Sequence, residues 1–235
     1  MKKIKNSHIL IVAGGSSLKK YWTKIERYIK ENECITFGCN HMNEIFIPDY
    51  HFWGSSKRWR KFGDKVNANS QLVFPDNWAI KLICKHRKEK FIKFRYCQKK
   101  KKISYENGIM NGNIKNIGMW AIFYAYTRGA AKIHIVGMDG YTFYSKEQLD
   151  NKEESQHCFG EGYSNRYGFS KAQSVDRRGN KKFNYTYSKS RDEENYNSLT
   201  LLYSYIKKKY GFSFKIITPT IFKDFYDSSI LNIKE

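Results

Sequence analysis

Residues 8–22 read HILIVAGGSSLKKYW, and this stretch decides the fold. Residues 9–13 are apolar and run directly into a turn composed of Gly14, Gly15, Ser16 and Ser17. A short apolar run that ends in glycines is typical of a strand buried on both faces, as in a parallel sheet flanked by helices. From Leu18 onward the apolar residues follow helical spacing. The stretch therefore predicts a strand, a glycine turn and a helix.

The glycine turn is a candidate phosphate site. Glycines let the backbone turn sharply and approach a ligand closely. Ser16 or Ser17 can cap the following helix, whose first N–H groups would then face whatever lies above the strand. An ordinary strand-to-helix turn explains the same residues equally well. The GxGxxG spacing is absent, which disfavours a dinucleotide site of the NAD type.

Length, charge and cysteine content limit the class of protein. A chain of 235 residues suits a single α/β domain over residues 1–235. The net charge of +21 favours anionic partners, although a composition rich in lysine, asparagine and isoleucine accounts for part of it. Five cysteines without a CxxC pair predict neither zinc nor a disulfide framework and suit a reducing cytoplasm. No apolar run is long enough for a signal peptide core or a bilayer span.

Further strands are expected at residues 34–38, 50–53 and 71–74. The first of these leads directly into Cys39 and Asn40. Ligands of open parallel sheets lie beyond the carboxyl ends of the strands, so we expect Asn40 beside the glycine turn. There its amide could bind a base or a sugar hydroxyl, and a simple turn-forming asparagine is the alternative.

The segment from Lys81 to Lys102 is strongly basic, with eleven Lys or Arg residues and one acidic residue, Glu89. One interpretation is a surface that binds an anion or faces a membrane. The alternative is a solvated edge strand over residues 90–96, whose lysines discourage pairing with other sheets.

The second half of the chain contains the next candidates. We expect a loop at residues 105–116, a buried helix at 117–127 and a second buried strand at 132–136. Asp139 follows that strand between two glycines, as a site residue or as a helix-cap or turn residue. Residues 142–190 form a long polar insertion, which predicts a lid-like segment containing His157. A helix at residues 192–210 and a strand at 213–217 follow.

Three motifs resemble a known family: VAGGSSL at residues 12–18, FGCN at 37–40 and RGAAKIHIVGMDGY at 128–141. They resemble the bacterial CMP-sialic acid-dependent sialyltransferases, which have a strand–GxGxSL–helix opening, a strand ending in CN and a GxKxIxLxGxDxY strand. The opening and the GxD strand are also similar to those of 6-hydroxymethylpterin pyrophosphokinase-like proteins. The resemblance implies a Rossmann-like α/β domain with a mostly parallel sheet.

The resemblance also implies roles for particular residues. The nucleotide donor would be held by the glycine turn and by Asn40, while Tyr141 and Tyr144 would donate hydrogen bonds to its phosphate. Gly118 falls where the family has a Thr-Ser-Gly segment on the nucleotide, but this chain has Asn116 and Ile117 before it. The general base of the family is a histidine, and this chain has Glu193 or Glu194 there. The base is therefore either His157, on the insertion, or Glu194, provided that the fold buries it.

The leading hypothesis is a glycosyltransferase of bacterial surface-polysaccharide assembly that moves a sialic-acid-like sugar from a CMP-linked donor to a glycan or glycolipid acceptor. It needs no metal, because tyrosine hydroxyls, helix N–H groups and lysines can stabilise the phosphate charge. It would be cytoplasmic, with peripheral contact to the inner membrane through the basic segment, and a homo-oligomer is compatible with it. The alternatives are a Mg-ATP-dependent pyrophosphokinase-like enzyme with Asp139 linked to the metal, and a non-enzymatic nucleic-acid-binding module, which the absence of a recognised motif disfavours.

Overall fold

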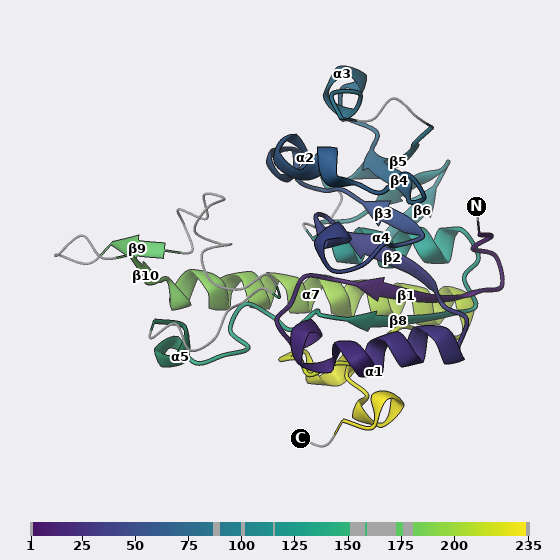
Figure 1. Cartoon of the computed structure of the whole chain (residues 1–235). Coiled ribbons are helices and arrows are strands. Elements are labelled where there is room, and N and C mark those ends of the chain that lie inside the picture. Colours follow the sequence, from purple (N-terminus) through teal and green to yellow (C-terminus); the bar gives the residue numbers. More distant parts are fainter. Residues whose placement is uncertain are drawn as a thin grey trace.

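The computed structural model describes residues 2–86, 90–99, 102–114, 116–150, 158, 173–175 and 181–233, with only the backbone at residues 150, 173–175 and 181–183. It is an α/β structure built on a nine-stranded sheet with helices on both faces (Figure 1). The strand order is β11-β8-β1-β2-β3-β4-β5-β7-β6, and every pair is parallel except β6 with β7. A separate antiparallel pair joins β9 and β10.

The strands of the large sheet are β1 (His8–Val12), β2 (Ile35–Cys39), β3 (Tyr50–Phe52), β4 (Gln71–Pro75), β5 (Ile92–Cys97), β6 (Ser104–Glu106), β7 (Ile109–Asn111), β8 (Lys132–Val136) and β11 (Lys215–Ile216). The separate pair is β9 (Gln173–Val175) and β10 (Lys181–Phe183). The helices are α1 (Ser17–Glu31), α2 (Ser56–Phe62), α3 (Ile80–Ile83), α4 (Ile117–Thr127), α5 (Lys146–Asp150) and α7 (Tyr185–Tyr210). Short 3₁₀ turns lie at Met42–Glu44, Gly63–Lys65, Lys223–Phe225 and Ser228–Leu231.

The side chains of β1 alternate between two cores. Ile9 and Ile11 pack in the cluster that contains α4 and α7, whereas Leu10 and Val12 pack in the cluster that contains α1. All four are fully buried. Because successive strand residues point to opposite faces, a continuous apolar run is what a sheet covered on both sides requires. The predicted buried strand is confirmed.

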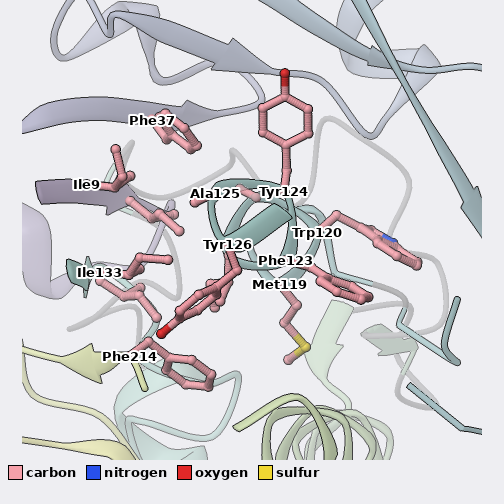
Figure 2. Packing of buried hydrophobic residues seen from close by; sticks show 14 of the residues in the cluster. Ile9, Phe37, Met119, Trp120, Phe123, Tyr124, Ala125, Tyr126, Ile133 and Phe214 are labelled. Atoms are coloured by element: carbon pink, nitrogen blue, oxygen red, sulfur yellow. The ribbon is translucent and has the colours of Figure 1, made fainter. Parts of the chain in front are cut away.

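Helix α4 is buried around its whole circumference, as the sequence predicts. Every residue from Gly118 to Tyr126 is buried. Figure 2 views this helix nearly end-on, with its side chains radiating in all directions toward residues such as Ile9, Phe37 and Phe214. Its packing fixes the amino end of α4 in place against the sheet.

The strand order reverses beside β1. From β1 the chain continues to β2, β3, β4 and β5 on one side, and β8 and β11 lie on the other side. At such a reversal the loops that follow the two central strands diverge, and this opens a crevice beyond their carboxyl ends. The glycine turn after β1 and the Asp139 turn after β8 both lie there.

Two expectations, the loop at residues 105–116 and the edge strand at residues 90–96, are wrong because of one hairpin, formed by β6 and β7. Residues 105–116 include the hairpin of β6 and β7 rather than a loop, with Asn107 and Gly108 at φ 50° and 75° in its turn. Asn-Gly favours such a hairpin turn, so the same residues that indicated a loop connect two short strands. Because β7 pairs with β5, the strand of the basic segment is an inner strand and not an edge.

The expected start of the long helix is also wrong. Helix α7 begins at Tyr185, seven residues before the expected start at Asp192, and the Asn184 side chain caps it by accepting from the Tyr187 N–H at 3.0 Å. Residues 142–190 therefore include the start of α7 together with α5, β9 and β10. Within the described residues, no helix is both long and apolar enough to cross a bilayer.

Candidate functional site

A cleft of about 470 Å³ opens at the carboxyl ends of the central strands. Six of the residues predicted to bind a nucleotide line it: Gly14, Gly15, Asn40, Gly118, Asp139 and Tyr141. They come from the turn after β1, the end of β2, the amino end of α4 and the turn after β8. Cavities of this size are typical of small-molecule sites.

The turns after β1 and β8 pack directly on each other. The Gly15 N–H donates to the Gly137 carbonyl at 2.7 Å, and Ala13 N–H donates to the Val136 carbonyl at 2.9 Å. A Cβ atom on Gly15 would lie 2.5 Å from Cγ of Asp139 and 2.6 Å from the Gly137 oxygen. Gly15 is therefore required by the approach of the neighbouring turn.

The Asp139 carboxylate occupies the amino end of α1. Its Oδ2 accepts from the Ser17 N–H at 2.7 Å and from the Ser16 hydroxyl at 3.2 Å, and its Oδ1 accepts from the Ser17 hydroxyl at 2.5 Å. Ser16 stands at the N-cap position without a capping side-chain bond. The expectation that Ser16 or Ser17 caps this helix is wrong. The carboxylate of Asp139, which follows the neighbouring strand β8 and is far away along the sequence, caps the helix instead.

Burial raises the pKa of Asp139 from 3.8 to about 6, against the opposing effect of the hydrogen bonds from Ser17 and Ser16. Its exposed fraction is only 2%. The Asp139 carboxyl is thus partly protonated just below neutral pH. The hydrogen-bond donors to this carboxyl come from Ser16 and Ser17.

Asn40 links the ends of β2 and β3. It adopts φ 57°, its N–H donates to the Phe52 carbonyl at 2.7 Å, and its Oδ1 accepts from the Gly54 N–H at 3.2 Å. With the amide oxygen held in this way, Nδ2 is the end of the side chain that remains for a ligand. The two interpretations of Asn40, a turn residue and a cleft residue, are compatible.

The loop that bears Tyr141 is held by a residue not predicted from the sequence, Asp192 of α7. Its carboxylate accepts from the N–H groups of Tyr141 and Thr142 and from the Thr142 hydroxyl, each at 2.8 Å. Burial raises the pKa of Asp192, and these bonds oppose the shift. Burial also raises the pKa of Tyr141, and the charges of Arg191 and Arg58 oppose that shift. The Tyr141 hydroxyl therefore lies in the field of both arginines.

The cleft residues that the sequence did not single out include Lys57, Arg58, Arg191 and Asn195. Asn195 is only 6% exposed, and its side chain makes no hydrogen bond to the described residues. A signal for it existed in the sequence. The buried stripe of α7 follows helical spacing and changes from apolar to polar where the helix passes the cleft: Ile206, Leu202, Leu199, Asn195, Asp192 and Ser188.

The remaining predicted residues do not line the cleft within the described part of the chain. Ser16 and Ser17 lie behind Asp139, and Tyr144 lies outside the lining. The Glu194 side chain is 46% exposed and forms an ion pair with Arg191 at 2.6 Å, so the burial that its role as a base required is absent.

His157 lies outside the described residues. The next residue, Cys158, is described, and its N–H donates to the Gly14 carbonyl at 3.2 Å. Burial raises the pKa of the Cys158 thiol to about 12. One point of the insertion is thus in contact with the glycine turn.

Among the described side chains, no group of three or more His, Cys, Asp or Glu is arranged to hold a metal ion. No protein-family model matches the chain, and a search of curated proteins finds no match.

Proposed function

We propose that this chain is a glycosyltransferase that binds a CMP-activated, sialic-acid-like sugar in the cleft and transfers the sugar to a glycan or glycolipid acceptor. One observation carries the proposal: the cleft at the strand reversal gathers Gly14, Asn40, Gly118 and Tyr141 from four separate segments. These are segments where the motif resemblance expects donor contacts. A Rossmann-like chain path belongs to the same proposal.

The reaction would be a direct displacement. The acceptor hydroxyl attacks the anomeric carbon, the bond from that carbon to the phosphate oxygen breaks, and CMP leaves with the bonding electron pair. The Tyr141 hydroxyl and the cations of the cleft stabilise the charge that develops on the leaving phosphate. Asn40 would bind the base or ribose through Nδ2.

We assign the base to His157 and propose that residues 142–190 act as a lid over the cleft. The hydrogen bond from Cys158 to Gly14 supports a lid that reaches the glycine turn. An imidazole suits proton removal from an acceptor hydroxyl near neutral pH. His157→Ala should lower turnover by roughly 10²- to 10⁴-fold while CMP binding is retained. The control His86→Ala, with a ring that contacts the Arg60 carbonyl of α2, should not change turnover.

Nucleotide binding tests the proposal directly. Thermal-shift measurements with CMP, CDP, UDP, GDP and ATP, each with and without magnesium, should give a selective response to CMP that is independent of the metal. Asn40→Ala should weaken CMP binding by about tenfold, whereas the exposed control Asn69→Ala should not. A response to ATP that depends on magnesium would favour the pyrophosphokinase-like alternative, and no response to CMP would overturn the proposal.

We further propose that the basic segment places the enzyme at the cytoplasmic face of an anionic membrane. Ile80, at the start of α3, is 63% exposed, and Lys81 and Lys85 beside it are exposed. An exposed aliphatic side chain among lysines suits a lipid surface. Binding to phosphatidylglycerol vesicles should be lost in Lys81→Glu/Lys85→Glu. It should persist in the matched control Lys207→Glu/Lys208→Glu on α7.

A further inference from the structure

We propose that the cleft contains a dedicated phosphate subsite formed by Arg58, Arg191 and Asn195 around Tyr141, and that the phosphate does not bind at the amino end of α1. It rests on the proposed function only in that both use the same cleft. The sequence analysis offered two positions for the phosphate, the glycine turn and the hydroxyls of Tyr141 and Tyr144, and the contacts of the glycine turn argue against the first.

The amino end of α1 is already occupied. The Asp139 carboxylate accepts the Ser17 N–H and both serine hydroxyls, so the donors that would bind a phosphate there serve a protein anion instead. A phosphate at this point would meet a buried carboxylate of the same charge. Displacing the carboxylate would leave it buried without its hydrogen bonds. The amino end of α1 is therefore closed to a second anion.

Another part of the cleft lining is positively charged. Arg58 comes from α2 and Arg191 from α7, both line the cleft, and both act electrostatically on Tyr141. Glu194, on the adjacent turn of α7, accepts from Arg191 at 2.6 Å and orients its guanidinium. Guanidinium groups bind phosphate oxygens through paired N–H donors, and the Tyr141 hydroxyl can add a further donor.

Asn195 is a third polar side chain beside the two arginines in the cleft lining. It lies one helical turn beyond Arg191, lines the cleft, is 94% buried and makes no hydrogen bond to the described residues. The amide atoms of Asn195 are not closed off from the cleft, so a ligand group there can form hydrogen bonds with them. The Tyr141 N–H donates to the Asp192 carboxylate of α7. The same helix therefore carries Arg191 and Asn195 and also holds the loop that bears Tyr141.

The experiment uses isothermal titration of the full chain with inorganic pyrophosphate at physiological salt. We expect saturable 1:1 binding that weakens at least about tenfold in Arg191→Gln and in Arg58→Gln. Asn195→Ala should weaken it by a smaller factor. The exposed controls, Lys189→Gln on α7 and Arg60→Gln on α2, carry the same charge change and should bind as the unaltered chain does. Arg191→Lys and Arg58→Lys keep the charge and guard against misfolding.

The outcomes separate this proposal from the proposed function. No saturable binding, or equal weakening in Arg191→Gln and Lys189→Gln, means an adventitious surface anion only and overturns the subsite. Pyrophosphate binding that depends on Arg58 and Arg191 supports the subsite even if CMP does not bind, in which case the proposed function fails alone. CMP binding that is unaffected by either arginine substitution overturns the subsite alone.

Discussion

The two ends of β1 and β8 both bury ionisable groups, yet they use them differently. At the amino end, Tyr28 shares a hydrogen bond with Nδ1 of His134, its hydroxyl lies 3.4 Å from Nε2 of His8, and Cys34 Sγ lies 3.6 Å from Nδ1 of His8. At the carboxyl end, Asp139 is held by serines, while Tyr141, Arg191 and Asn195 line a cavity. At the amino end the polar side chains form hydrogen bonds with one another. At the carboxyl end several of them line an open cleft.

Perturbed ionisation does not distinguish the two ends. Burial lowers the pKa of His8 to about 4 and that of His134 to about 3, and these shifts are at least as large as the one at Asp139. None of the four amino-end residues lines the cleft. A shifted pKa therefore identifies a desolvated group, and a cavity with incompletely satisfied polar side chains is what indicates a binding site.

The largest effect is expected from Gly15→Ala at the carboxyl end. The added Cβ would meet Asp139 and the Gly137 carbonyl at distances that real Cβ atoms do not adopt, so the two turns must separate. We expect a loss of about 2–3 kcal/mol in the free energy of unfolding, measured in urea, and loss of CMP binding. Gly211→Asn is the control, because that position is open and its φ of 78° is tolerated by asparagine. Unchanged stability in Gly15→Ala would show that the turns are not in contact.

The pH dependence of stability should have opposite signs at the two ends. The folded pKa of Asp139 lies above its ordinary value, so between about pH 4 and 6 the folded state binds the extra proton and stability falls as pH rises. The folded pKa values of His8 and His134 lie below theirs, so stability falls as pH decreases from about 6.5 to 4.

Substitutions at each end should separate these slopes. Asp139→Asn should make the loss of stability toward acid steeper, because the opposing contribution is removed, while His134→Gln should make it shallower. Urea titrations at several pH values between 4 and 7 measure both slopes. Equal slopes in Asp139→Asn and the unaltered chain would contradict the raised pKa of Asp139.

A smaller effect is expected from Tyr28→Phe at the amino end. His134 is buried and loses its hydrogen-bond partner, which costs about 1–2 kcal/mol of unfolding free energy. CMP and pyrophosphate affinities should not change, because Tyr28 does not line the cleft. The half-buried Tyr21→Phe on the same helix is the matched control. A change in ligand affinity in Tyr28→Phe would break the distinction between the two ends.

The smallest effect is expected from Glu194→Gln. Its ion pair with Arg191 is partly exposed, and such pairs contribute about 0.5 kcal/mol or less. Turnover in a CMP-sugar transfer assay should stay within about twofold of the unaltered chain. A loss of two orders of magnitude would instead return Glu194 to the role of general base.

The sequence predicted the central half of the fold well. The strands β1, β2 and β8 and the helices α1 and α4 have clear apolar patterns in the sequence, and the structure contains each of them close to its expected position. Their loops could also be assigned to one edge of the sheet, which is why Gly14, Asn40 and Tyr141 were predicted and do line the cleft together. Parallel topology alone is enough for that inference.

The missed features depend on contacts between distant residues. Three-residue strands such as β6 and β7 are too short for alternation to reveal, and Asn-Gly is common to loops and hairpins alike. The role of Asp139 at α1 follows only from the pairing of β1 with β8. Arg58 and Arg191 belong to helices on different parts of the sheet, so no spacing along the chain could bring them together.

The hydrogen bond from Ser17 to Asp139 has a consequence for the order of folding. Its partners are 122 residues apart in the chain, whereas Ile9 of β1 finds its β2 partner at Ile35. Pairing over a long loop carries a larger entropic cost and comes later. During synthesis, β1 and α1 therefore leave the ribosome long before the carboxylate that completes them. We expect the amino-terminal strands to associate first, and the floor of the cleft to close only when β8 inserts beside β1.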